Sequence, residues 1–329
     1  MRVDLLATED HYYRHILPIF AALPENVRGA VFRRPVPDLR RRVDSGSRVL
    51  VGAVGDLRQL FGRRRAILAE HGAGQSYRGD WRSRLEPAYA GGTGRENVDL
   101  FLVPGPDPER RNLEAWPEAP VVAVGDPSLD AYLDRPRTRP GPRAGVGAPV
   151  VALAFHWENS LIPETRSAYP AFAPFLRGLL PRFEVLGHAH PRARVEVEGY
   201  YRTLGIPWST YDEVLARADV VVTDTSSVGF EAAALGLGVV WLNAPWYRRE
   251  VSHGLRFWDA VAVGVEVDDP AELEGAISAA TFAEPSSSER AEILARVYSY
   301  LDGRSAERAA EAILALDGIS LPERTEARA

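Results

Sequence analysis

A cluster of hydroxyl side chains follows one of the most apolar runs of the sequence. In the stretch VVVTDTSSVGFE, Thr225, Ser226 and Ser227 come directly after an expected buried strand and open a helix. Small hydroxyls and exposed amides at a helix start form a ready site for an anion such as phosphate. Glu231 lies one turn further along, and Gly229 would let a ligand approach closely. Ser and Thr also favour helix N-caps, so ordinary capping is the alternative interpretation.

His71 is a second candidate, because it directly follows an expected strand and precedes Gly72. At such a strand end the ring is expected to project from the edge of the sheet, outside the core. Histidine is the side chain best suited to accept a proton from a hydroxyl near neutral pH. His71 is therefore a candidate general base, and a structural histidine is the alternative.

Alternating polar residues in VLGHAHPRAR form a third candidate. In an extended segment His188, His190 and Arg192 would point the same way. Arg192 and either histidine could then bind phosphate oxygens. The His-x-His spacing also suits a metal, but no carboxylate or further histidine stands nearby at ligand spacing, so no metal is expected.

Two further stretches hold weaker candidates. The turn AVGDPSLD places Gly125, Pro127 and Asp130 after an expected strand, where they could support a site or simply connect strand to helix. The loop AFHWENS brings His156 and Trp157 together after another strand. These two side chains could contact a base or a ribose, or form a polar loop beside a buried tryptophan.

Short apolar runs alternate with helical stretches along the whole chain, which is typical of parallel α/β layers. We expect strands at residues 3–7, 48–53, 65–70, 100–103, 121–124, 150–155, 183–186, 219–223 and 239–242. We expect helices near residues 10–20, 169–180, 211–218, 227–235, 271–280, 288–301 and 305–316, the first capped by Asp10. The candidate residues therefore cluster at the carboxyl ends of strands.

A stretch rich in Pro, Gly and Arg, DRPRTRPGPRAGVGAP, interrupts this alternation and is typical of a linker. We predict an N-terminal domain over 1–134, a linker over 135–149, a C-terminal domain over 150–318 and a tail over 319–329. Both domains are expected to be Rossmann-like, with parallel sheets facing a central cleft. Ligands of such domains bind at the carboxyl ends of the strands.

Composition excludes several classes of protein. With 329 residues, 46% hydrophobic and 26% charged, the chain is neither disordered nor a multi-span membrane protein. A formal net charge of −6 argues against a nucleic-acid partner. The chain has no Cys, which excludes thiolate chemistry, and all 39 basic residues are Arg, which excludes a Schiff base and a lysine phosphate clamp. No long apolar run occurs, so we expect a cytoplasmic protein, at most peripheral on the cytoplasmic face of a membrane.

Clusters of arginine leave open whether the protein contacts a membrane surface. Arg33–Arg34, Arg40–Arg42 and Arg63–Arg65 could be solvated faces or could rest on an anionic membrane. Trp246–Arg249 could be an interfacial anchor or a covered loop.

In this order the stretches resemble the CDP-glycerol glycerophosphotransferase family of teichoic-acid synthesis, within the GT-B glycosyltransferase architecture. The hydroxyl block resembles the family's strand, Asp-x-Ser-Ser and helix block, with Glu231 at the place of its acidic residue. Residues 189–191 are similar to its His-Pro motif and residues 70–72 to its His-Gly motif. Residues 124–130 resemble its Gly-x-Pro-Arg-Asn-Asp turn, and residues 300–313 its closing Asp-Gly…Arg segment.

The chain departs from this family in three places. Residues 73–76 replace the family's Thr-Pro and lysines, and Ser128 replaces the arginine of the turn. The HWEN loop resembles instead the His-Arg-x-Glu-Asn loop of UDP-N-acetylglucosamine 2-epimerases, although their opening Gly-Thr-Arg-Pro-Glu motif is missing.

The resemblance implies a transferase of cell-envelope polymer synthesis, with an acceptor-side domain over 1–134 and a nucleotide-donor-binding domain over 150–318. It would move glycerol phosphate or a related polyol phosphate from a CDP-activated donor to a hydroxyl acceptor, which could be lipid-linked. It implies catalytic roles for His71 and His190, donor phosphate contacts from Arg192 and the hydroxyl residues, and a ribose or polyol contact from Glu231. The residues expected to support the cleft are Gly72, Gly125, Pro127, Asp130 and His156.

No cofactor or metal is expected, since the nucleotide-activated donor is itself the substrate. Two alternatives remain open. One is an NDP-sugar glycosyltransferase or an enzyme like UDP-N-acetylglucosamine 2-epimerase, and the other is a non-catalytic GT-B scaffold.

Overall fold

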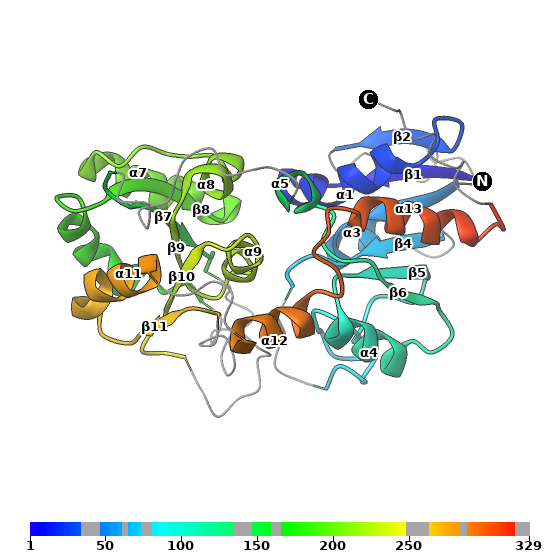
Figure 1. Ribbon diagram of the computed structural model, residues 1–329. Coiled ribbons are helices and arrows are strands. Elements are labelled where there is room, and N and C mark those ends of the chain that lie inside the picture. Colours follow the sequence, from blue (N-terminus) through cyan, green and yellow to red (C-terminus); the bar gives the residue numbers. More distant parts are fainter. Residues whose placement is uncertain are drawn as a thin grey trace. The chain divides into compact units, whose positions relative to one another are not determined.

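A computed structural model describes residues 1–33, 47–60, 65–73, 80–133, 147–158, 166–247, 263–282 and 288–319 (Figure 1). The chain divides into two compact units. The first, here called the N-unit, comprises Met1–His71, Asp80–Ala131 and Tyr298–Ala329. The second, the C-unit, comprises Gly72–Gly79 and Tyr132–Val297.

The N-unit contains a parallel sheet in the order β2-β1-β3-β4-β5-β6. Its strands are β1 (Arg2–Leu6), β2 (Arg28–Phe32), β3 (Ser47–Val51), β4 (Ala66–Ala69), β5 (Val98–Val103) and β6 (Val121–Ala123). Five of them were expected from their apolar runs, and four of these are largely buried. The sixth, β2, was missed because its sequence, RGAVF, begins with Arg and Gly, whereas the partly buried edge strand β6 is apolar throughout.

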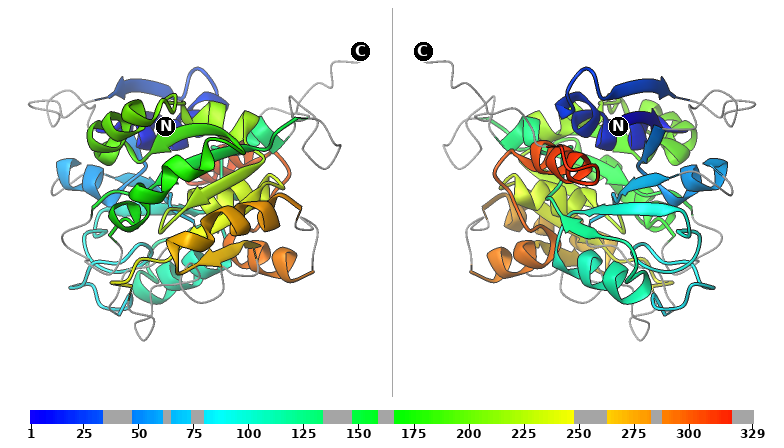
Figure 2. Two further views of the ribbon diagram at one scale, coloured as in Figure 1. Left: turned by 90° about the vertical axis from the view of Figure 1, so that its left-hand side faces the viewer. Right: turned by 90° about the vertical axis from the view of Figure 1, so that its right-hand side faces the viewer.

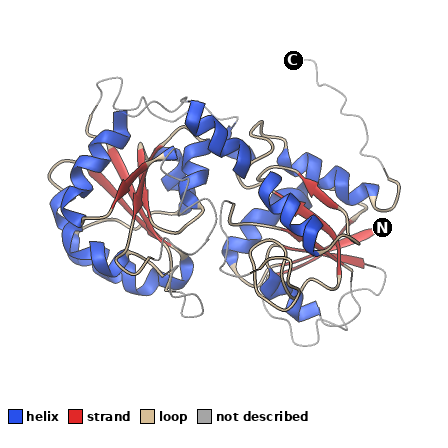
Figure 3. Cartoon of the chain, turned by 90° about the horizontal axis from the view of Figure 1, so that it is seen from below, coloured by secondary structure: helices blue, strands red, loops and turns tan. Residues whose placement is uncertain are grey.

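Helices flank this sheet, as the blue and red elements of Figure 3 show. They are α1 (Asp10–Ala22), α3 (Val54–Leu57), α4 (Pro106–Ala115) and α13 (Ser305–Ala315), with a 3-10 turn, η1 (Arg58–Leu60). The boundary between the two units falls inside α5 (Asp130–Leu133). Asp10 is the first residue of α1, and Glu9 occupies the N-cap position that was expected for Asp10.

The C-terminal segment corrects the predicted division of the chain. Sequence reasoning placed residues 150–318 in one domain, but residues from Tyr298 onward fall in the N-unit. The helix α13, red in Figure 2, packs on α1 and buries Ala309 and Ile313 in the core that also contains Leu5. The apolar periodicity of α13 predicts a buried face, but it carries no information about which sheet that face covers.

Asp130 holds this returning segment in place. Its Oδ1 accepts a hydrogen bond from the backbone N–H of Ser305 at 3.1 Å, and its Oδ2 accepts one from Ala306 at 2.7 Å. These are otherwise unsatisfied amides of the first turn of α13, so Asp130 caps the helix. Gly125 lies beside the same turn with a φ of +89°, and a Cβ there would stand 2.4 Å from the Ser305 hydroxyl.

The C-unit contains a second parallel sheet, in the order β11-β10-β9-β7-β8. Its strands are β7 (Val150–Phe155), β8 (Glu184–Ala189), β9 (Val220–Thr223), β10 (Gly238–Leu242) and β11 (Val265–Val267). Its helices are α6 (Tyr169–Phe172), α7 (Arg194–Leu204), α8 (Tyr211–Arg217), α9 (Val228–Ala234), α11 (Leu273–Phe282) and α12 (Ser288–Val297). Three 3-10 segments accompany them: η4 (Ala173–Leu179), η5 (Pro191–Ala193) and η7 (Pro270–Glu272).

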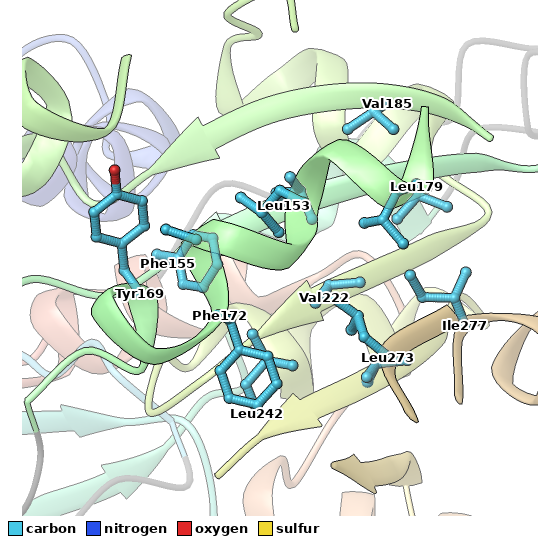
Figure 4. Packing of buried hydrophobic residues seen from close by; sticks show 14 of the residues in the cluster. Leu153, Phe155, Tyr169, Phe172, Leu179, Val185, Val222, Leu242, Leu273 and Ile277 are labelled. Carbon is cyan, nitrogen blue, oxygen red and sulfur yellow. The ribbon is translucent and has the colours of Figure 1, made fainter. Parts of the chain in front are cut away.

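Figure 4 shows the apolar core on one face of this sheet. Leu153 and Phe155 of β7, Val222 of β9 and neighbouring side chains pack against Phe172 of α6 and Ile277 of α11. Because these strand residues are fully or almost fully buried, the strand ends are held firmly. The prediction of two parallel α/β sheets is confirmed, while β11 and α7 were not expected.

Strand order identifies one position in each sheet where a ligand is favoured. Successive connections change direction between β1 and β3 in the N-unit and between β7 and β9 in the C-unit. At such a topological switch point, the loops after the two strands diverge and leave room for a ligand. The candidate residues after β7 and β9 lie at the switch point of the C-unit.

Several predicted features fall outside the described residues: most of the linker, Arg34, Arg40–Arg42, Arg63–Arg64 and Arg248–Arg249. Trp246 and Tyr247 are described, and both side chains donate hydrogen bonds to the carbonyl of Arg166. They pack against the C-unit core, as a covered loop would. Among the described helices, none has the length and apolarity needed to cross a bilayer.

Candidate functional site

His71 stands at the carboxyl edge of the N-unit sheet, just after β4. Its Nδ1 lies 2.5 Å from the carbonyl oxygen of Gly52, which follows β3. A carbonyl can only accept, so Nδ1 donates, and Nε2 is the ring nitrogen whose lone pair can take up a proton. This arrangement suits a general base. Gly72, next in the chain, has a φ of +75°, which lets the backbone turn sharply after the histidine.

A group of aromatic and imidazole rings surrounds His71. From α1, the ring centroids of His11, Tyr12 and His15 lie 6.3, 4.8 and 5.6 Å from that of His71, and Tyr89 lies 6.3 Å away. Sequence reasoning missed the histidines of α1. Their i, i+4 spacing was the available signal, because it places both rings on one helix face.

Asp126 connects this group to the turn after β6. Its Oδ1 lies 3.8 Å from Nδ1 of His15 and accepts hydrogen bonds from the amide and the hydroxyl of Ser128, at 2.9 and 2.7 Å. Burial would raise the pKa of Asp126, but the contacts with His15 and Ser128 outweigh it and lower the pKa. Ser128, which replaces the arginine of the resembling turn, thus helps to keep Asp126 ionised. Gly125 and Pro127, predicted to support a site, form the buried turn that presents Asp126.

Glu70 precedes His71 and points into the protein. Its Oε1 accepts a hydrogen bond from Asn112 at 3.1 Å and lies 3.9 Å from the Arg95 guanidinium. Burial raises the pKa of Glu70 to about 7 despite these partners. Arg95 also donates to the carbonyls of Ala88 and Tyr89, at 2.9 and 2.8 Å. The pair therefore fixes the segment that carries Tyr89 beside the end of β4.

A carboxylate bridges the switch point of the N-unit. Asp56, after β3, accepts hydrogen bonds on Oδ1 from the hydroxyl and the amide of Thr8, which follows β1. Its Oδ2 is buried and has no hydrogen-bond partner among the described residues. Burial raises the pKa of Asp56 to about 6.

A second carboxylate bridges the switch point of the C-unit. Asp224, fully buried after β9, accepts on Oδ1 from the amides of His156 and Thr225, at 2.9 and 2.8 Å. On Oδ2 it accepts from the Ser167 hydroxyl and the Ala168 amide, at 2.8 and 2.9 Å. Sequence reasoning did not single out this residue, although it lies inside the hydroxyl block. Asp224 joins that block to the loop after β7.

His190 follows β8 and is placed by two backbone contacts. Its amide donates to the carbonyl of Phe155 at 2.8 Å, and its Nδ1 accepts from the amide of Arg192 at 3.2 Å. In the neutral ring the proton is therefore on Nε2, which makes His190 a hydrogen-bond donor. The Arg192 guanidinium stacks 4.7 Å from the Trp157 ring, whose centroid lies 6.0 Å from that of His190.

His156 completes this group, 5.3 Å from the ring of His190. Burial lowers the pKa of His156, since a buried imidazolium is disfavoured. Its Nδ1 is buried and makes no hydrogen bond within the described part of the chain. His156 therefore lies beside His190 as a neutral ring.

His188 does not join this group. Its Nδ1 lies 3.0 Å from the carbonyl of Ser209, and its ring packs 5.5 Å from Trp208. The strand ends at Ala189 and the chain turns into η5, so the alternation that would align His188 with Arg192 is broken.

The predicted hydroxyl residues open the short helix α9. Thr225 is buried, whereas Ser226 and Ser227 are half-buried. The hydroxyl of Ser226 accepts from the Val228 amide at 3.4 Å, a local turn contact, and the N-cap residue Ser227 makes no side-chain capping bond. The hydroxyl of Ser227 donates to Oε1 of buried Glu231 at 2.9 Å, so these two residues form a pair.

Gly229 has a different role from the one expected. A Cβ at this position would lie 2.0 Å from the ring of Trp241. Gly229 therefore makes room for a core tryptophan, and the expectation that it admits a ligand was wrong. Among the described residues, no group of three or more His, Asp or Glu side chains could hold a metal ion.

Comparison with protein families gives one match. Residues 177–315 match the family described as CDP-Glycerol:Poly(glycerophosphate) glycerophosphotransferase. The matched stretch contains His190, Arg192, the hydroxyl block and all of α13. The resemblance drawn from the sequence motifs is thus confirmed over this part of the chain. Curated proteins gave no match.

Solved structures with a similar fold include a teichoic acid polymerase and epimerase-type proteins. The wall teichoic acid polymerase TagF matches with a TM-score of 0.63 and 12% identity, over 95% of this chain and 88% of that chain. MnaA of S. aureus, in a co-structure with UDP, matches with a TM-score of 0.61 and 14% identity, over 97% and 98%. A UDP-N-acetylglucosamine 2-epimerase matches with a TM-score of 0.52 and 14% identity, over 98% and 100%. At these identities the likeness confirms the two-sheet fold alone.

Proposed function

We propose that this chain, which matches the glycerophosphotransferase family over residues 177–315, transfers glycerol phosphate or a related polyol phosphate from a CDP-activated donor to a hydroxyl acceptor. The family match carries the proposal, because it includes His190, Arg192 and the hydroxyl block, which surround the switch point of the C-unit. The N-unit supports it with a histidine whose Nε2 can accept a proton.

In this proposal His71 is the general base. Nε2 of His71 takes the proton from the acceptor hydroxyl as its oxygen attacks the β-phosphorus of the donor in line. The new bond joins the acceptor oxygen to that phosphorus, and the bond from the phosphorus to the bridging oxygen breaks. CMP leaves with the electron pair of the broken bond.

The C-unit binds the donor phosphates in this proposal. The Nε2–H of His190 and the guanidinium of Arg192 neutralise charge that develops on the phosphate oxygens. The hydroxyl of Ser226 adds a neutral donor, with Thr225 beneath it. Ser227 adds a second one when its hydroxyl turns from Glu231 to the phosphate. Because the chain has no lysine, arginine and imidazole must supply this charge. These groups suffice for the proposed reaction, which calls for no resident cofactor or metal.

Glu231 remains the candidate contact to the ribose or the polyol. Its Oε1 is bound to the Ser227 hydroxyl, so a donor that contacts one of these residues also affects the other.

The test is release of CMP from CDP-glycerol by the purified full chain, with a glycerol-terminated acceptor. We expect CMP release that depends on the acceptor, and no release of UMP or UDP when UDP-N-acetylglucosamine replaces CDP-glycerol. Absence of CMP release with CDP-glycerol and with CDP-activated polyols generally would contradict the proposal.

A second candidate function, an NDP-sugar glycosyltransferase or 2-epimerase, is favoured by the loop after β7. His156 and Trp157 in this loop resemble the epimerase loop, and epimerases share the fold. Thermal melting of the protein with CMP, CDP and UDP separates the two functions. CMP and CDP should raise the melting temperature under the first proposal and UDP under the second, whereas a scaffold would respond to none at millimolar concentration.

The proposal also concerns the identity of the hydroxyl acceptor. A lipid-linked acceptor would bring the protein to the cytoplasmic membrane face. Two arginines of the predicted lipid-binding clusters are described, and both are near carboxylates. Arg33 lies 2.7 Å from Asp10, and Arg65 lies 3.7 Å from Asp99. Cosedimentation with anionic vesicles would test this contact.

A further inference from the structure

We propose that Tyr89 contacts the hydroxyl acceptor beside His71, and that a buried polar network holds Tyr89 in that place. The network consists of Glu70, Arg95 and Asn112 and is here called the loop anchor. The inference rests on the proposed function, in which the acceptor hydroxyl must reach the His71 ring. Tyr89 is then a specificity-determining residue of the acceptor site, and the members of the loop anchor are positioning residues that act through it.

The segment that carries Tyr89 connects β4 to β5 and is long for a connection within a sheet. Its described part, residues 80–97, contains neither helix nor strand. Connections of this length without secondary structure are usually either functional loops or disordered linkers. This one is held in a defined conformation by buried polar contacts, so it has the character of a binding loop.

Arg95 is the centre of the loop anchor. Its side chain is only 1% exposed, and its guanidinium donates hydrogen bonds to the carbonyls of Ala88, Tyr89 and Thr93, at 2.9, 2.8 and 3.0 Å. Glu70 Oε1 lies 3.9 Å from the same guanidinium and supplies the opposite charge. One planar guanidinium therefore fixes the backbone on both sides of Tyr89.

Asn112 of α4 connects this guanidinium and carboxylate to the rest of the N-unit. Its amide nitrogen donates to Glu70 Oε1 at 3.1 Å and to the carbonyl of Pro108 at 2.9 Å, while its oxygen accepts from the Gly91 amide at 2.9 Å. Gly91 has a φ of +73°, and a Cβ there would stand 2.6 Å from the carbonyl oxygen of Trp81. The turn after Tyr89 is therefore packed too closely for any side chain.

Burying these polar groups is costly, which argues for a role beyond packing. Burial raises the pKa of Glu70 to about 7, although the contacts with Arg95 and Asn112 lower it. Replacing a buried ion pair by apolar side chains of similar volume is often neutral or stabilising. Apolar residues would thus fill this space at less cost, so we attribute the loop anchor to the conformation that it gives to the segment around Tyr89.

This conformation places Tyr89 against His71. The centroids of the two rings lie 6.3 Å apart, with an angle of 67° between the ring planes. Tyr89 is half-buried, so part of its side chain is exposed to solvent beside the histidine. An acceptor that brings its hydroxyl to the His71 ring therefore meets Tyr89 as one wall of its site.

The chemistry of tyrosine suits the acceptor of the proposed reaction. The end of a polyol chain presents C–H groups and hydroxyls side by side, and tyrosine has an apolar ring with a polar tip. Sites for small molecules combine aromatic walls with a few polar groups in the same way. Tyr12 lies closer to His71, at 4.8 Å, but it also packs against the apolar core of the N-unit, so its replacement would combine two effects.

The first test measures acceptor binding and needs no donor. A synthetic glycerol phosphate trimer is titrated into the full chain, and NMR follows the 12 tyrosine rings, with Tyr89→Phe identifying the signal of Tyr89. We expect that signal to shift and the Kd of the trimer to rise about tenfold in Tyr89→Ala, because one wall of the site is lost. An unmoved Tyr89 signal, or an unchanged Kd in a folded Tyr89→Ala protein, would overturn the contact.

The matched control for this contact is Tyr13. It is also a half-buried tyrosine of the N-unit, and the guanidinium of Arg33 stacks 4.2 Å from its ring. Its signal should stay in place during the titration, and Tyr13→Ala should leave the Kd of the trimer unchanged. A shift of the Tyr13 signal as large as that of Tyr89 would overturn the assignment to Tyr89.

The loop anchor is tested by Arg95→Lys, since lysine keeps the charge but lacks the planar fork. This variant should raise the Kd of the trimer about as much as Tyr89→Ala. The matched control is Arg48→Lys, which alters a buried arginine near the start of β3, paired with Asp99 and Asp317, and should leave the Kd unchanged. Equal effects of the two arginine variants would overturn the role of the loop anchor.

Hydrogen exchange of the unmodified protein tests the same point if Arg95→Lys does not fold. The amides of Gly91, Gly92 and Thr93 are bonded to Asn112 Oδ1 and to the carbonyls of Trp81 and Glu86. They should therefore exchange slowly. Exchange as fast as in an unstructured peptide would show that the loop is not fixed and would overturn this part of the inference.

Steady-state kinetics separates the role of Tyr89 from the proposed function. Tyr89→Ala should raise the KM for the acceptor about tenfold and leave the KM for CDP-glycerol and kcat within about twofold. CMP release with an unchanged acceptor KM would contradict the role of Tyr89 and retain the transferase. Binding of the trimer at Tyr89 without CMP release from any CDP donor would support the contact and contradict the transferase.

Discussion

His71 and His190 occupy comparable places in the two units, each just after a parallel strand, but their rings are held in opposite ways. The Nδ1 of His71 faces the carbonyl of Gly52, at 2.5 Å, and must donate. The Nδ1 of His190 faces the amide of Arg192, at 3.2 Å, and must accept. The outward nitrogen is therefore basic in His71 and a proton donor in the neutral His190. A single backbone neighbour decides which chemistry each histidine can perform.

The carboxylates at the two switch points differ in a similar way. Asp224 in the C-unit accepts four hydrogen bonds, two on each oxygen. Asp56 in the N-unit accepts from Thr8 on one oxygen, and its other oxygen is buried with no partner in the described part of the chain. Asp224 is therefore held on both oxygens, whereas Asp56, whose pKa burial raises to about 6, can be protonated at mildly acidic pH.

The largest expected effect comes from removing the basic nitrogen. His71→Ala should lower kcat for CMP release by about a hundredfold or more, because the acceptor hydroxyl loses its general base. Steady-state kinetics on the folded variant measures this. The matched control is His188→Gln, which alters a histidine bound to the Ser209 carbonyl and should leave turnover near normal. An equal loss of kcat in His71→Ala and His188→Gln would contradict the assignment of the general base to His71.

Replacing the donor histidine should have a somewhat smaller effect of a different kind. His190→Gln should lower kcat by about a hundredfold, as expected for one misplaced donor to a developing negative charge. The acid limb of the pH profile should not move, because His190 does not serve as the base. A shift of that limb would contradict the contrast between the two rings.

The smallest effects concern the two carboxylates and are measured as free energies of unfolding. Asp224→Asn should destabilise the protein by about 3 kcal/mol, because an amide nitrogen cannot accept the bonds that one oxygen made. Asp56→Asn should cost less at neutral pH. Because the folded-state pKa of Asp56 is raised from 3.8 to about 6, its burial lowers stability as pH rises through that interval. Asp56→Asn should remove this pH-dependent loss, about 2 kcal/mol, as denaturant titrations between pH 4 and pH 7 would show.

Much of the fold could be predicted because parallel strands buried on both faces are continuous apolar runs. The run at Val150–Phe155 matches β7 residue for residue. The edge strands β2 and β11 are partly exposed and lack that signal. The docking of α13 on the N-unit could not be predicted, because it depends on the capping of Ser305 by Asp130, 175 residues away in the chain.

The residues of the candidate site also fall into two groups, those that the sequence predicted and those that it did not. His71, His190 and Arg192 were found because each follows a strand, which is a local property. Asp224 and His15 were not singled out, because their contacts are with partners that are distant in sequence. Asp224, for example, joins residues 57 and 68 positions away.

The sequence by itself determined the two parallel sheets, the likeness to a family of phosphate-transferring enzymes, and the residue types at the strand ends. These follow from apolar runs and short motifs, which are local. Only the tertiary structure decided which unit receives the last helix, that Gly229 accommodates Trp241, and which nitrogen of each histidine carries the proton. These depend on atoms brought together from distant parts of the chain, and the proton on His71 is placed by a carbonyl 19 residues earlier.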